Sequence, residues 1–180
     1  MAQPHELEKG LYLTATPIGH ARDISLRALE VLANVDLIAA EDTRVTAKLL
    51  AIHGIQNALA PYNDHNAAKA RPALLARLKA GGRIALVSDA GTPLVSDPGF
   101  KLVREAIAEG IEVHAVPGPS AVLAALSSSG LPSDRFLFAG FLPSKAGERR
   151  AVLEELRPVR ASLILFESAQ RLAESLTAMT

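Results

Sequence analysis

The stretch Leu11-Tyr12-Leu13-Thr14-Ala15-Thr16-Pro17-Ile18-Gly19-His20 shows the pattern that organises the chain. A short apolar run, residues 11–15, leads directly into a loop with a proline and a glycine. Further short runs of this kind follow, and most lack polar alternation, which is typical of parallel strands covered on both faces. The predicted strands are 11–15, 35–40, 58–62, 83–88, 111–116, 135–139 and 162–166.

Helical patterns lie between these strands. Asp97-Pro98 predicts an N-cap followed by a proline in the first turn, and Gly110 predicts the end of the same helix. A second helix is predicted to open at Pro119 or Ser120 and to end by Gly130. The alternation of strands and helices predicts an α/β protein with a mainly parallel sheet.

One segment interrupts this alternation more strongly than the others. Val116-Pro117-Gly118-Pro119 combines two prolines with a glycine, so we place a domain boundary there. The predicted domains are residues 1–117 and residues 118–180, and the second is short for a self-sufficient domain. Within the first, Pro72 either starts a helix or kinks one begun near Asn66.

Composition narrows the functional classes. The chain has 19 basic and 19 acidic residues, so an RNA partner would need a local basic patch. The absence of cysteine excludes a disulfide framework, a thiolate zinc site and a cysteine nucleophile. Residues 1–10 lack a signal-peptide pattern, and no apolar run approaches the ~20 residues of a membrane span. We therefore expect a cytoplasmic protein.

Several common site motifs are missing. The first strand is not followed by G-x-G-x-x-G, and the P-loop pattern is absent, which disfavours a dinucleotide oxidoreductase or a P-loop ATPase. The histidines form no H-x-x-x-H pair, so no metal site is expected. Ser120 lacks the following glycine of a nucleophile elbow.

Loops after the first five predicted strands carry glycine, proline or polar residues. Taken singly, each is explained by turn and capping preferences. Taken together, they fall on the carboxyl edge of a parallel sheet, where ligands gather, and so predict a ligand crevice. The loops are 14–20, 41–44, 62–66, 88–99 and 117–121.

Several motifs, in order along the chain, resemble the ribosomal RNA small subunit methyltransferase I family. The resemblance runs from residue 11 to about residue 175. The motifs are Leu11-Tyr12-Leu13-Thr14-Ala15-Thr16-Pro17-Ile18-Gly19, Ala40-Glu41-Asp42-Thr43-Arg44, Ser88-Asp89-Ala90-Gly91-Thr92-Pro93, Pro117-Gly118-Pro119-Ser120-Ala121, Ser129-Gly130-Leu131-Pro132, Asp134-Arg135-Phe136-Leu137-Phe138 and Gly140-Phe141-Leu142-Pro143.

The resemblance implies a fold and an activity. The family belongs to the tetrapyrrole methylase superfamily, with two α/β domains and an S-adenosylmethionine cleft between them. Its activity is 2′-O-methylation of a cytidine ribose in the decoding region of 16S ribosomal RNA, and it is usually a homodimer. Because its chains normally run beyond the position of Thr180, the resemblance implies a second domain that is incomplete here.

The resemblance also implies cofactor contacts. Gly91 has no side chain to obstruct a backbone contact, and Ser120 offers a hydroxyl and a helix-start amide to a carboxylate. The implied cofactor-binding residues are Pro17, Ala90, Gly91, Thr92, Val95, Ser120, Ala121, Phe166 and Glu167.

Two departures from the family pattern are visible. His20 stands where the family usually has asparagine. The stretch Phe166-Glu167-Ser168-Ala169-Gln170-Arg171 stands where the family usually has Tyr-Glu-Ser-Pro-His-Arg. The first could alter the loop beside the cofactor, and the second removes a proline and a histidine.

Methyl transfer requires alignment of the acceptor oxygen and removal of its proton. The candidate bases are Glu41, Asp42, Asp64 and His65, and the residues alone do not choose among them. Glu41 and Asp42 could equally be solvated loop charge or a helix cap. The candidate RNA contacts are Arg44, Lys48, Lys145, Arg149 and Arg150, although the run 143–150 could equally be a solvated helix start.

Two rival functions remain open. Methylation of a tetrapyrrole carbon would predict a glycine-rich first loop and a Gly-Asp-Pro loop, whereas this chain has Thr-Pro-Ile-Gly and Ala-Gly-Thr-Pro. A non-catalytic S-adenosylmethionine-binding module would keep the crevice without turnover.

Overall fold

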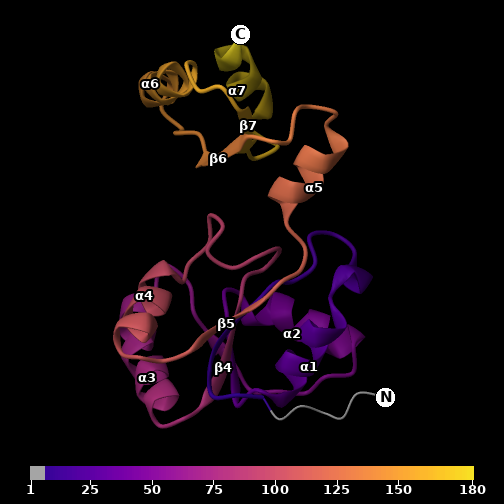
Figure 1. Ribbon diagram of the computed structural model, residues 1–180, viewed down its shortest axis with the longest axis vertical. Coiled ribbons are helices and arrows are strands. Elements are labelled where there is room, and N and C mark those ends of the chain that lie inside the picture. Colours follow the sequence, from indigo (N-terminus) through magenta and orange to yellow (C-terminus); the bar gives the residue numbers. More distant parts are fainter. Residues whose placement is uncertain (1–6) are drawn as a thin grey trace. The chain divides into compact units, whose positions relative to one another are not determined.

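The protein contains a five-stranded, all-parallel sheet in its first 120 residues, as seen in a computed structural model that describes residues 7–180 (Figure 1). The strand order is β3-β2-β4-β1-β5. The strands are β1 Gly10–Thr14, β2 Leu37–Ala40, β3 Leu59–Pro61, β4 Arg83–Val87 and β5 Val113–Val116. Each predicted strand is present, and each end lies within two residues of its predicted position.

Helices cover both faces of this sheet. Helices α1 (Leu26–Asn34) and α2 (Thr43–Ile52) contribute to one apolar cluster, and α3 (Ala67–Lys79) and α4 (Phe100–Ala108) contribute to the other (Figure 1). A short 3₁₀ helix, Ala21–Asp23, precedes α1. The sheet is therefore sandwiched between two helical layers, and its loops are its most accessible parts.

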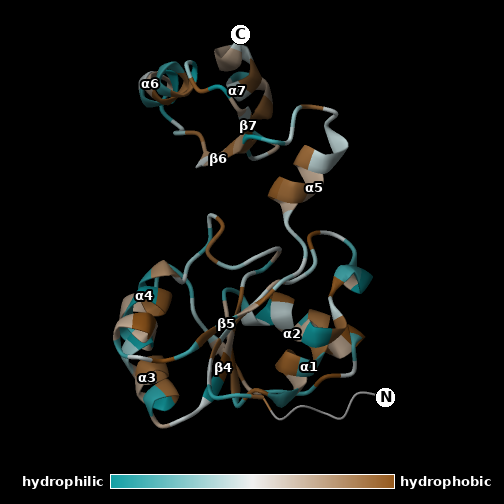
Figure 2. Cartoon of the chain, viewed as in Figure 1, coloured by the Kyte–Doolittle hydropathy of each residue, from teal (hydrophilic) through white to brown (hydrophobic). Residues whose placement is uncertain are grey.

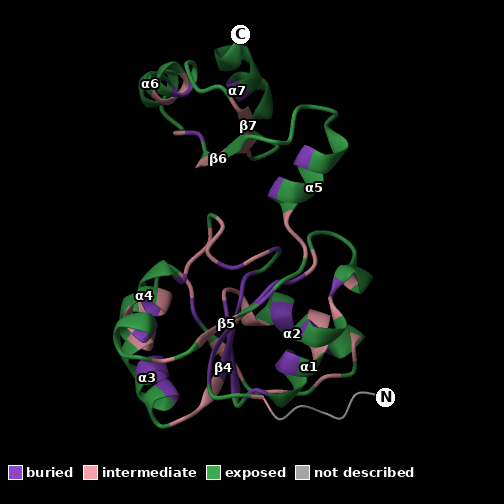
Figure 3. Ribbon diagram, in the orientation of Figure 1, coloured by how far each residue is buried: buried purple, intermediate pink, exposed green. Residues whose placement is uncertain are grey.

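The strands form the core because they are almost wholly apolar. Leu11, Ile38 and Ile84 are fully buried, and the hydrophobic strands run through the centre with polar residues mainly on the outer helices (Figures 2 and 3). Tyr12 belongs to the cluster beneath α1, whereas Leu11 belongs to the cluster beneath α3 and α4. Successive side chains of β1 thus point to opposite faces of the sheet.

Helix α4 begins later than the sequence predicts. It starts at Phe100 rather than Pro98, with Gly99 as N-cap at a φ of 134°. A Cβ at Gly99 would lie 2.7 Å from the Leu86 side chain. The segment before it is extended by two residues with positive φ, Leu94 (72°) and Ser96 (65°), which hold the chain out of a helix.

The structure also decides between the two interpretations of Pro72. Helix α3 begins at Ala67, after Asn66, and contains Pro72 in its second turn. Proline lacks an N–H, so one helical hydrogen bond is missing at this position.

Residues 121–180 form a second compact unit. It contains α5 Ala121–Ser128, β6 Phe136–Phe141, α6 Ala146–Leu156, β7 Ser162–Phe166 and α7 Leu172–Met179. The strands β6 and β7 are parallel, with an irregularity between Phe138 and Gly140. None of the helices in the described part of the chain is long and apolar enough to cross a membrane.

Candidate functional site

At the carboxyl edge of the five-stranded sheet, loops that follow neighbouring strands contact one another, mainly through hydrogen bonds. Strand β4 lies between β2 and β1, and β5 lies on the other side of β1. Four loops that are far apart in sequence therefore meet as neighbours, and each has at least one specific contact with the next. Such contacts hold polar groups in place before any ligand arrives, which is how a binding site is preorganised.

The loops after β1 and β4 are joined by a two-residue antiparallel bridge. The Thr16 N–H donates to the Gly91 carbonyl (2.9 Å), and the Gly91 N–H donates to the Thr16 carbonyl (3.1 Å). The buried Thr16 hydroxyl donates to the Ser88 carbonyl at 3.1 Å. The Gly91 amide and carbonyl are thus already engaged, so Gly91 shapes the loop, at a φ of 92°, more than it offers its own polar groups to a ligand.

The loop after β5 is attached to the same platform. The Thr92 hydroxyl donates to the Pro119 carbonyl at 3.1 Å, immediately before Ser120. A Cβ at Gly118 would lie 2.9 Å from the Ala15 Cβ, so glycine permits the close approach of the β1 and β5 loops. Thr92 therefore sets the position of the backbone on which Ser120 stands.

The loops after β2 and β4 exchange hydrogen bonds through two carboxylates. The Asp89 N–H donates to Glu41 Oε2 (3.3 Å), and the Asp42 N–H donates to Asp89 Oδ1 (3.0 Å). Next to them, the Asn63 side-chain amide donates to the Glu41 carbonyl at 3.4 Å. Glu41 is consequently held by the two neighbouring loops, those after β4 and β3.

Asp42 is occupied as a helix cap. Its carboxylate accepts the Arg44 N–H at 2.8 Å and forms an ion pair with the Arg44 guanidinium. The hydrogen bonds from Arg44 lower the pKa of Asp42 to about 2. A carboxylate that holds its charge so firmly accepts a proton weakly, so the geometry argues against Asp42 as a base.

Glu41 has the opposite environment. Burial raises its pKa above the ordinary glutamate value, against the effect of the Asp89 amide, and the charges of Asp97, Asp89 and Asp64 raise it further. Burial likewise raises the pKa of Asp97, followed by the charges of Asp89 and Asp64, while a hydrogen bond with Ser88 opposes the shift. The raised pKa makes Glu41 the stronger proton acceptor of the adjacent pair.

The other two candidate bases lie in the loop after β3, at the edge of the sheet. Asp64 and His65 are both exposed, and Asp64 is close enough for its charge to act on Glu41. The His65 N–H donates to Asn63 Oδ1 at 3.2 Å, which orders the loop backbone. Neither side chain has the half-buried setting of Glu41.

The remaining cofactor candidates of the first unit offer mixed chemistry. Pro17, Thr92, Val95 and Ser120 are half-buried, and Ala90 is exposed. Apolar groups for an adenine ring thus lie on the same loops as hydroxyl groups, with the Glu41 and Asp97 carboxylates on the same edge for a cationic group. This donor set fits S-adenosylmethionine, which carries a base, a sulfonium and an amino-acid moiety.

The departure from the family pattern at His20 has a local explanation. His20 is exposed and caps the 3₁₀ helix, with its Nδ1 accepting the Arg22 N–H at 3.3 Å. Asparagine is also a good cap, so the substitution preserves the hydrogen-bonding role at this position.

In the second unit, Phe166 is the last residue of β7 and Glu167 follows it. The Phe166 ring packs edge-on against Phe138, with ring centroids 4.7 Å apart. The Glu167 side chain is only 7% exposed and is bound by the Arg171 guanidinium (2.7 Å) and the Ser175 hydroxyl (2.6 Å). These bonds lower the pKa of Glu167, Ser175 first. The carboxylate is thus committed to its own unit, which argues against the predicted side-chain contact with a cofactor. Ala121, by contrast, is an exposed first residue of α5.

The candidate RNA contacts divide into exposed and buried cations. Arg44, Lys48, Lys145 and Arg150 are exposed. Arg149 is not: its side chain is 3% exposed, and its guanidinium is 2.6 Å from Glu174 of α7. The Nε of Arg149 has no partner among the described residues. Arg149 therefore links α6 to α7, and the expectation of an RNA contact there does not fit its burial.

Sequence reasoning missed three residues that organise this edge. Thr16 looked like an ordinary loop threonine, yet it is buried and bonded to two other loop residues. Asp89 was not singled out, and Asp97 was interpreted as a helix cap. The length of the 88–99 loop was the signal in the sequence that could have pointed to Asp89 and Asp97. Among the described residues, it is the longest loop between a strand and the next helix.

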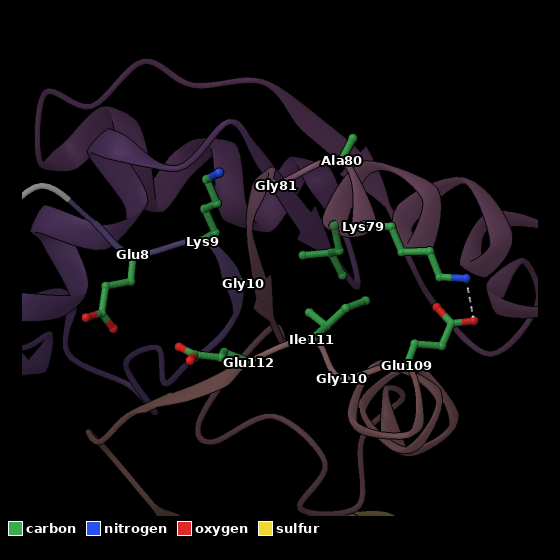
Figure 4. A pocket seen from close by; sticks show the side chains of 11 residues that line it. Glu8, Lys9, Gly10, Lys79, Ala80, Gly81, Glu109, Gly110, Ile111 and Glu112 are labelled. Carbon is green, nitrogen blue, oxygen red and sulfur yellow. Dashed lines mark ion pairs between the residues drawn. The ribbon is translucent and has the colours of Figure 1, made fainter.

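A separate groove of about 690 Å³ lies at the opposite, amino edge of the sheet (Figure 4). It is lined by Gly10 at the start of β1 and by the ends of α3 and α4, where Lys79 pairs with Glu109 at 3.0 Å. Ligands of open parallel sheets bind outside the carboxyl ends of the strands, so this groove is not the site assembled by the loops.

Comparisons with known proteins agree with the fold and extend it. The family model described as Tetrapyrrole (Corrin/Porphyrin) Methylases matches residues 10–180. Over 173 residues, the chain is 61% identical to the Ribosomal RNA small subunit methyltransferase I of Mesorhizobium japonicum. The match covers 96% of this chain and 59% of that protein. The chain spans about 60% of the lengths of the curated relatives that it matches.

Two solved structures are similar at low sequence identity. The uroporphyrin-III C-methyltransferase from Thermus thermophilus has a TM-score of 0.65 at 23% identity, over 96% of this chain and 74% of that one. A diphthine synthase has a TM-score of 0.71 at 19% identity, over 94% and 71%. These two proteins have different names for their activities, so the likeness shows the fold and leaves the acceptor undecided.

Proposed function

Because the chain belongs to the family of tetrapyrrole (corrin/porphyrin) methylases, we propose that it acts in an S-adenosylmethionine-dependent methyl transfer to small-subunit ribosomal RNA. The single observation that carries this proposal is the 61% identity to a ribosomal RNA small subunit methyltransferase I. The finer assignment, the ribose 2′-hydroxyl of a cytidine in the decoding region of 16S RNA, rests on the motif resemblance. We further propose the cytoplasm as its location and a homodimer as its assembly.

The carboxyl edge of the first unit supports this proposal through its arrangement. The Thr16–Gly91 bridge and the Thr92–Pro119 hydrogen bond hold three loops in fixed relation. When bound, S-adenosylmethionine supplies a methyl carbon to an attacking oxygen and retains the electron pair of the broken carbon–sulfur bond on sulfur. The loops would orient the cofactor, and alignment of this kind can supply a large part of the rate.

We assign the proton-accepting role to Glu41. Its carboxylate is half-buried, is oriented by the Asp89 amide and has a raised pKa. As the ribose oxygen forms its bond to the methyl carbon, its proton would pass to Glu41. Asp42 is unsuited because Arg44 already binds its carboxylate. Asp97 would keep Glu41 basic through its nearby charge.

The test is methyl transfer from labelled S-adenosylmethionine to small ribosomal subunits isolated from a strain that lacks the enzyme. We expect 2′-O-methylcytidine when the RNA nucleosides are separated by mass spectrometry. Uroporphyrinogen III, offered in parallel, tests the rival assignment to a tetrapyrrole carbon. Methylation of that acceptor, or cofactor binding without any methylated product, would overturn the proposal in favour of one of its two rivals.

A further inference from the structure

The amino edge of the sheet contains a cluster of ligating side chains that the methyl-transfer site does not use. Glu8 precedes β1, Glu112 precedes β5, and His114 lies within β5. One ligating atom from each of the three lies within 4.8 Å of the other two. We propose that Glu8, Glu112 and His114 form a binding site for a divalent metal ion of the zinc type.

The imidazole is already held in a metal-binding orientation. The ring of His114 stacks on Tyr12, with centroids 4.5 Å apart, and its Nε2 lies 3.2 Å from the Lys9 carbonyl. Donation from Nε2 to this carbonyl leaves a lone pair on Nδ1, which lies 4.0 Å from Glu8 Oε2. Metal-binding histidines usually donate their second ring N–H to a carbonyl or carboxylate in this way.

The backbone around the ring is shaped to admit it. A Cβ at Gly10 would lie 2.9 Å from His114 Nε2 and 2.5 Å from the Glu112 carbonyl oxygen. The Tyr12 hydroxyl donates to the Glu8 carbonyl at 2.6 Å, which fixes the chain that carries the first carboxylate. His114 and Tyr12 are paired residues of neighbouring strands, so Tyr12 sets the position of both.

The distances require little movement on binding. Zinc ligands lie about 2.0–2.2 Å from the metal, so two of them are at most about 4.4 Å apart. Glu8 Oε2 is 4.0 Å from Nδ1, whereas Glu112 Oε2 is 3.7 Å from Nε2 and would turn toward Nδ1 on binding. One ligating atom from each of the three residues already lies within 4.8 Å of the other two. Both carboxylates are more than 70% exposed and free to rotate by the remaining few tenths of an ångström.

The charges favour a divalent cation over a proton alone. Two carboxylates face one imidazole. Arg27 and Arg83 are cations close enough for their charges to act on Tyr12, on which the imidazole stacks, but both guanidinium groups have other partners. The Arg83 guanidinium is paired with Asp36, and the Arg27 guanidinium donates to the Ala115 carbonyl. Figure 4 shows Lys9 turned away from both carboxylates. An imidazole among the ligands selects zinc-type ions, because Mg²⁺ and Ca²⁺ prefer oxygen ligands alone.

Such an ion would fasten the segment before β1 to β5. It would lie at the opposite edge from the loops of the proposed methyl-transfer site, so the two proposals stand or fall separately. No step of the methyl transfer depends on it.

The experiment is titration calorimetry of the protein with Zn²⁺ at neutral pH. We expect saturable 1:1 binding with micromolar affinity. The double variant Glu8→Gln with Glu112→Gln should weaken it by about tenfold or more, which is the loss seen even for groups that only support a ligand. His114→Ala should abolish the binding. The exposed histidine and glutamate variants His20→Ala and Glu154→Gln are the matched controls and should bind as the wild type does.

The double variant keeps the experiment decisive if loss of the stacked imidazole unfolds the protein, because both carboxylates are exposed. Absence of saturable binding would overturn the proposal. So would wild-type affinity in the double variant, because the zinc would then bind elsewhere on the surface.

Discussion

The carboxyl edge and the amino edge of the five-stranded sheet differ in how their loops are connected. At the carboxyl edge, the loops that run from the strands to the following helices differ in length, from two residues after β2 to twelve after β4, and they are hydrogen-bonded to one another, as by the Thr16–Gly91 bridge. At the amino edge, α3 and α4 end close to the strands that follow them, and tight turns at Gly81 and Gly110 complete the connections. One edge is a bonded platform, and the other is an open groove.

The difference also has an electrostatic side. Helices begin at the carboxyl edge, where their N–H groups carry partial positive charge, and end at the amino edge, where their carbonyls carry partial negative charge. An anionic ligand therefore suits the first edge and a cation suits the second. Glu41 and Asp97 nevertheless have raised pKa values, because burial and the charges of neighbouring aspartates outweigh the effect of the helix N-termini. Changes at the two edges should consequently separate activity from stability.

The largest expected effect is at Glu41. Glu41→Gln should reduce the methyl-transfer rate by about 10²- to 10⁴-fold, the usual contribution of a general base, because glutamine cannot accept the proton. Cofactor affinity should change little. The measurement is the single-turnover rate on small ribosomal subunits, with Glu30→Gln on the exposed face of α1 as control. A greater loss in Asp42→Asn than in Glu41→Gln would assign the base to Asp42 instead.

The pH dependence of the rate sharpens the same assignment. A base must be deprotonated, so the rate should fall about tenfold per pH unit below the pKa of Glu41. Because burial and the charge of Asp97 raise that pKa, the fall should begin at a higher pH than for an ordinary glutamate. Asp97→Asn removes one charge and should move the fall to lower pH. An acid limb that stays in place in Asp97→Asn would contradict the coupling of the two carboxyl groups.

At the amino edge, the expected effect is on stability. Gly10→Ala should lower the free energy of unfolding by about 3 kcal/mol, because φ is 139° and the new Cβ would meet the Glu112 carbonyl at 2.5 Å. Gly54→Ala, at a φ of 68° with open space around it, should cost only about 1 kcal/mol. Urea unfolding measures both. Equal losses would mean that the close approach at Gly10 relaxes easily.

Much of the fold was predictable because its signals are local. Apolar runs bounded by glycine and proline located the strands, and Gly110 and Gly130 correctly placed two helix ends. The predicted start of α4 was wrong because Asp97-Pro98 has the local sequence pattern of an N-cap and a first helical turn. The positive φ values at Leu94 and Ser96 interrupt the helical conformation before Gly99, and the local pattern does not predict them.

The candidate site was predictable only in part, for the same reason. Its loops could be identified from the edge rule, but the choice between Glu41 and Asp42 depends on burial and on Arg44. Arg149 looked like a surface cation within a basic run, whereas the packing of α6 on α7 buries it. The Glu8, Glu112 and His114 cluster was invisible, because only the pairing of β1 with β5 brings residues more than 100 positions apart together.

RNA engagement tests whether the carboxyl edge or the second unit supplies the cations. The double variant Lys145→Gln with Arg150→Gln should weaken RNA binding about tenfold at moderate salt and reduce its salt dependence by about one unit per lost contact. Arg44→Gln with Lys48→Gln makes the same test at the carboxyl edge. The exposed lysines in Lys69→Gln with Lys101→Gln provide the charge-matched control. Slopes that remain parallel to the wild type in all three variants would place the RNA on other cations.

The smallest effect concerns the bond that attaches the β5 loop to the platform. Thr92→Val keeps the side-chain shape but removes the hydrogen bond to the Pro119 carbonyl, a net loss of about 1 kcal/mol. Because Pro119 precedes Ser120, we expect S-adenosylmethionine affinity to fall about fivefold while the rate at saturating cofactor stays the same.

Thr92→Ser should restore the affinity, since it restores the hydroxyl. Thr177→Val is the matched control, because the hydroxyl of Thr177 bonds only within α7. Zinc binding at the amino edge should be unaffected in every one of these variants. An unchanged cofactor affinity in Thr92→Val would show that the β5 loop keeps its place without this bond. The close approach of Gly118 to Ala15 and the hydrogen bond from the Ala15 N–H to the Val116 carbonyl would then contribute to holding the loop.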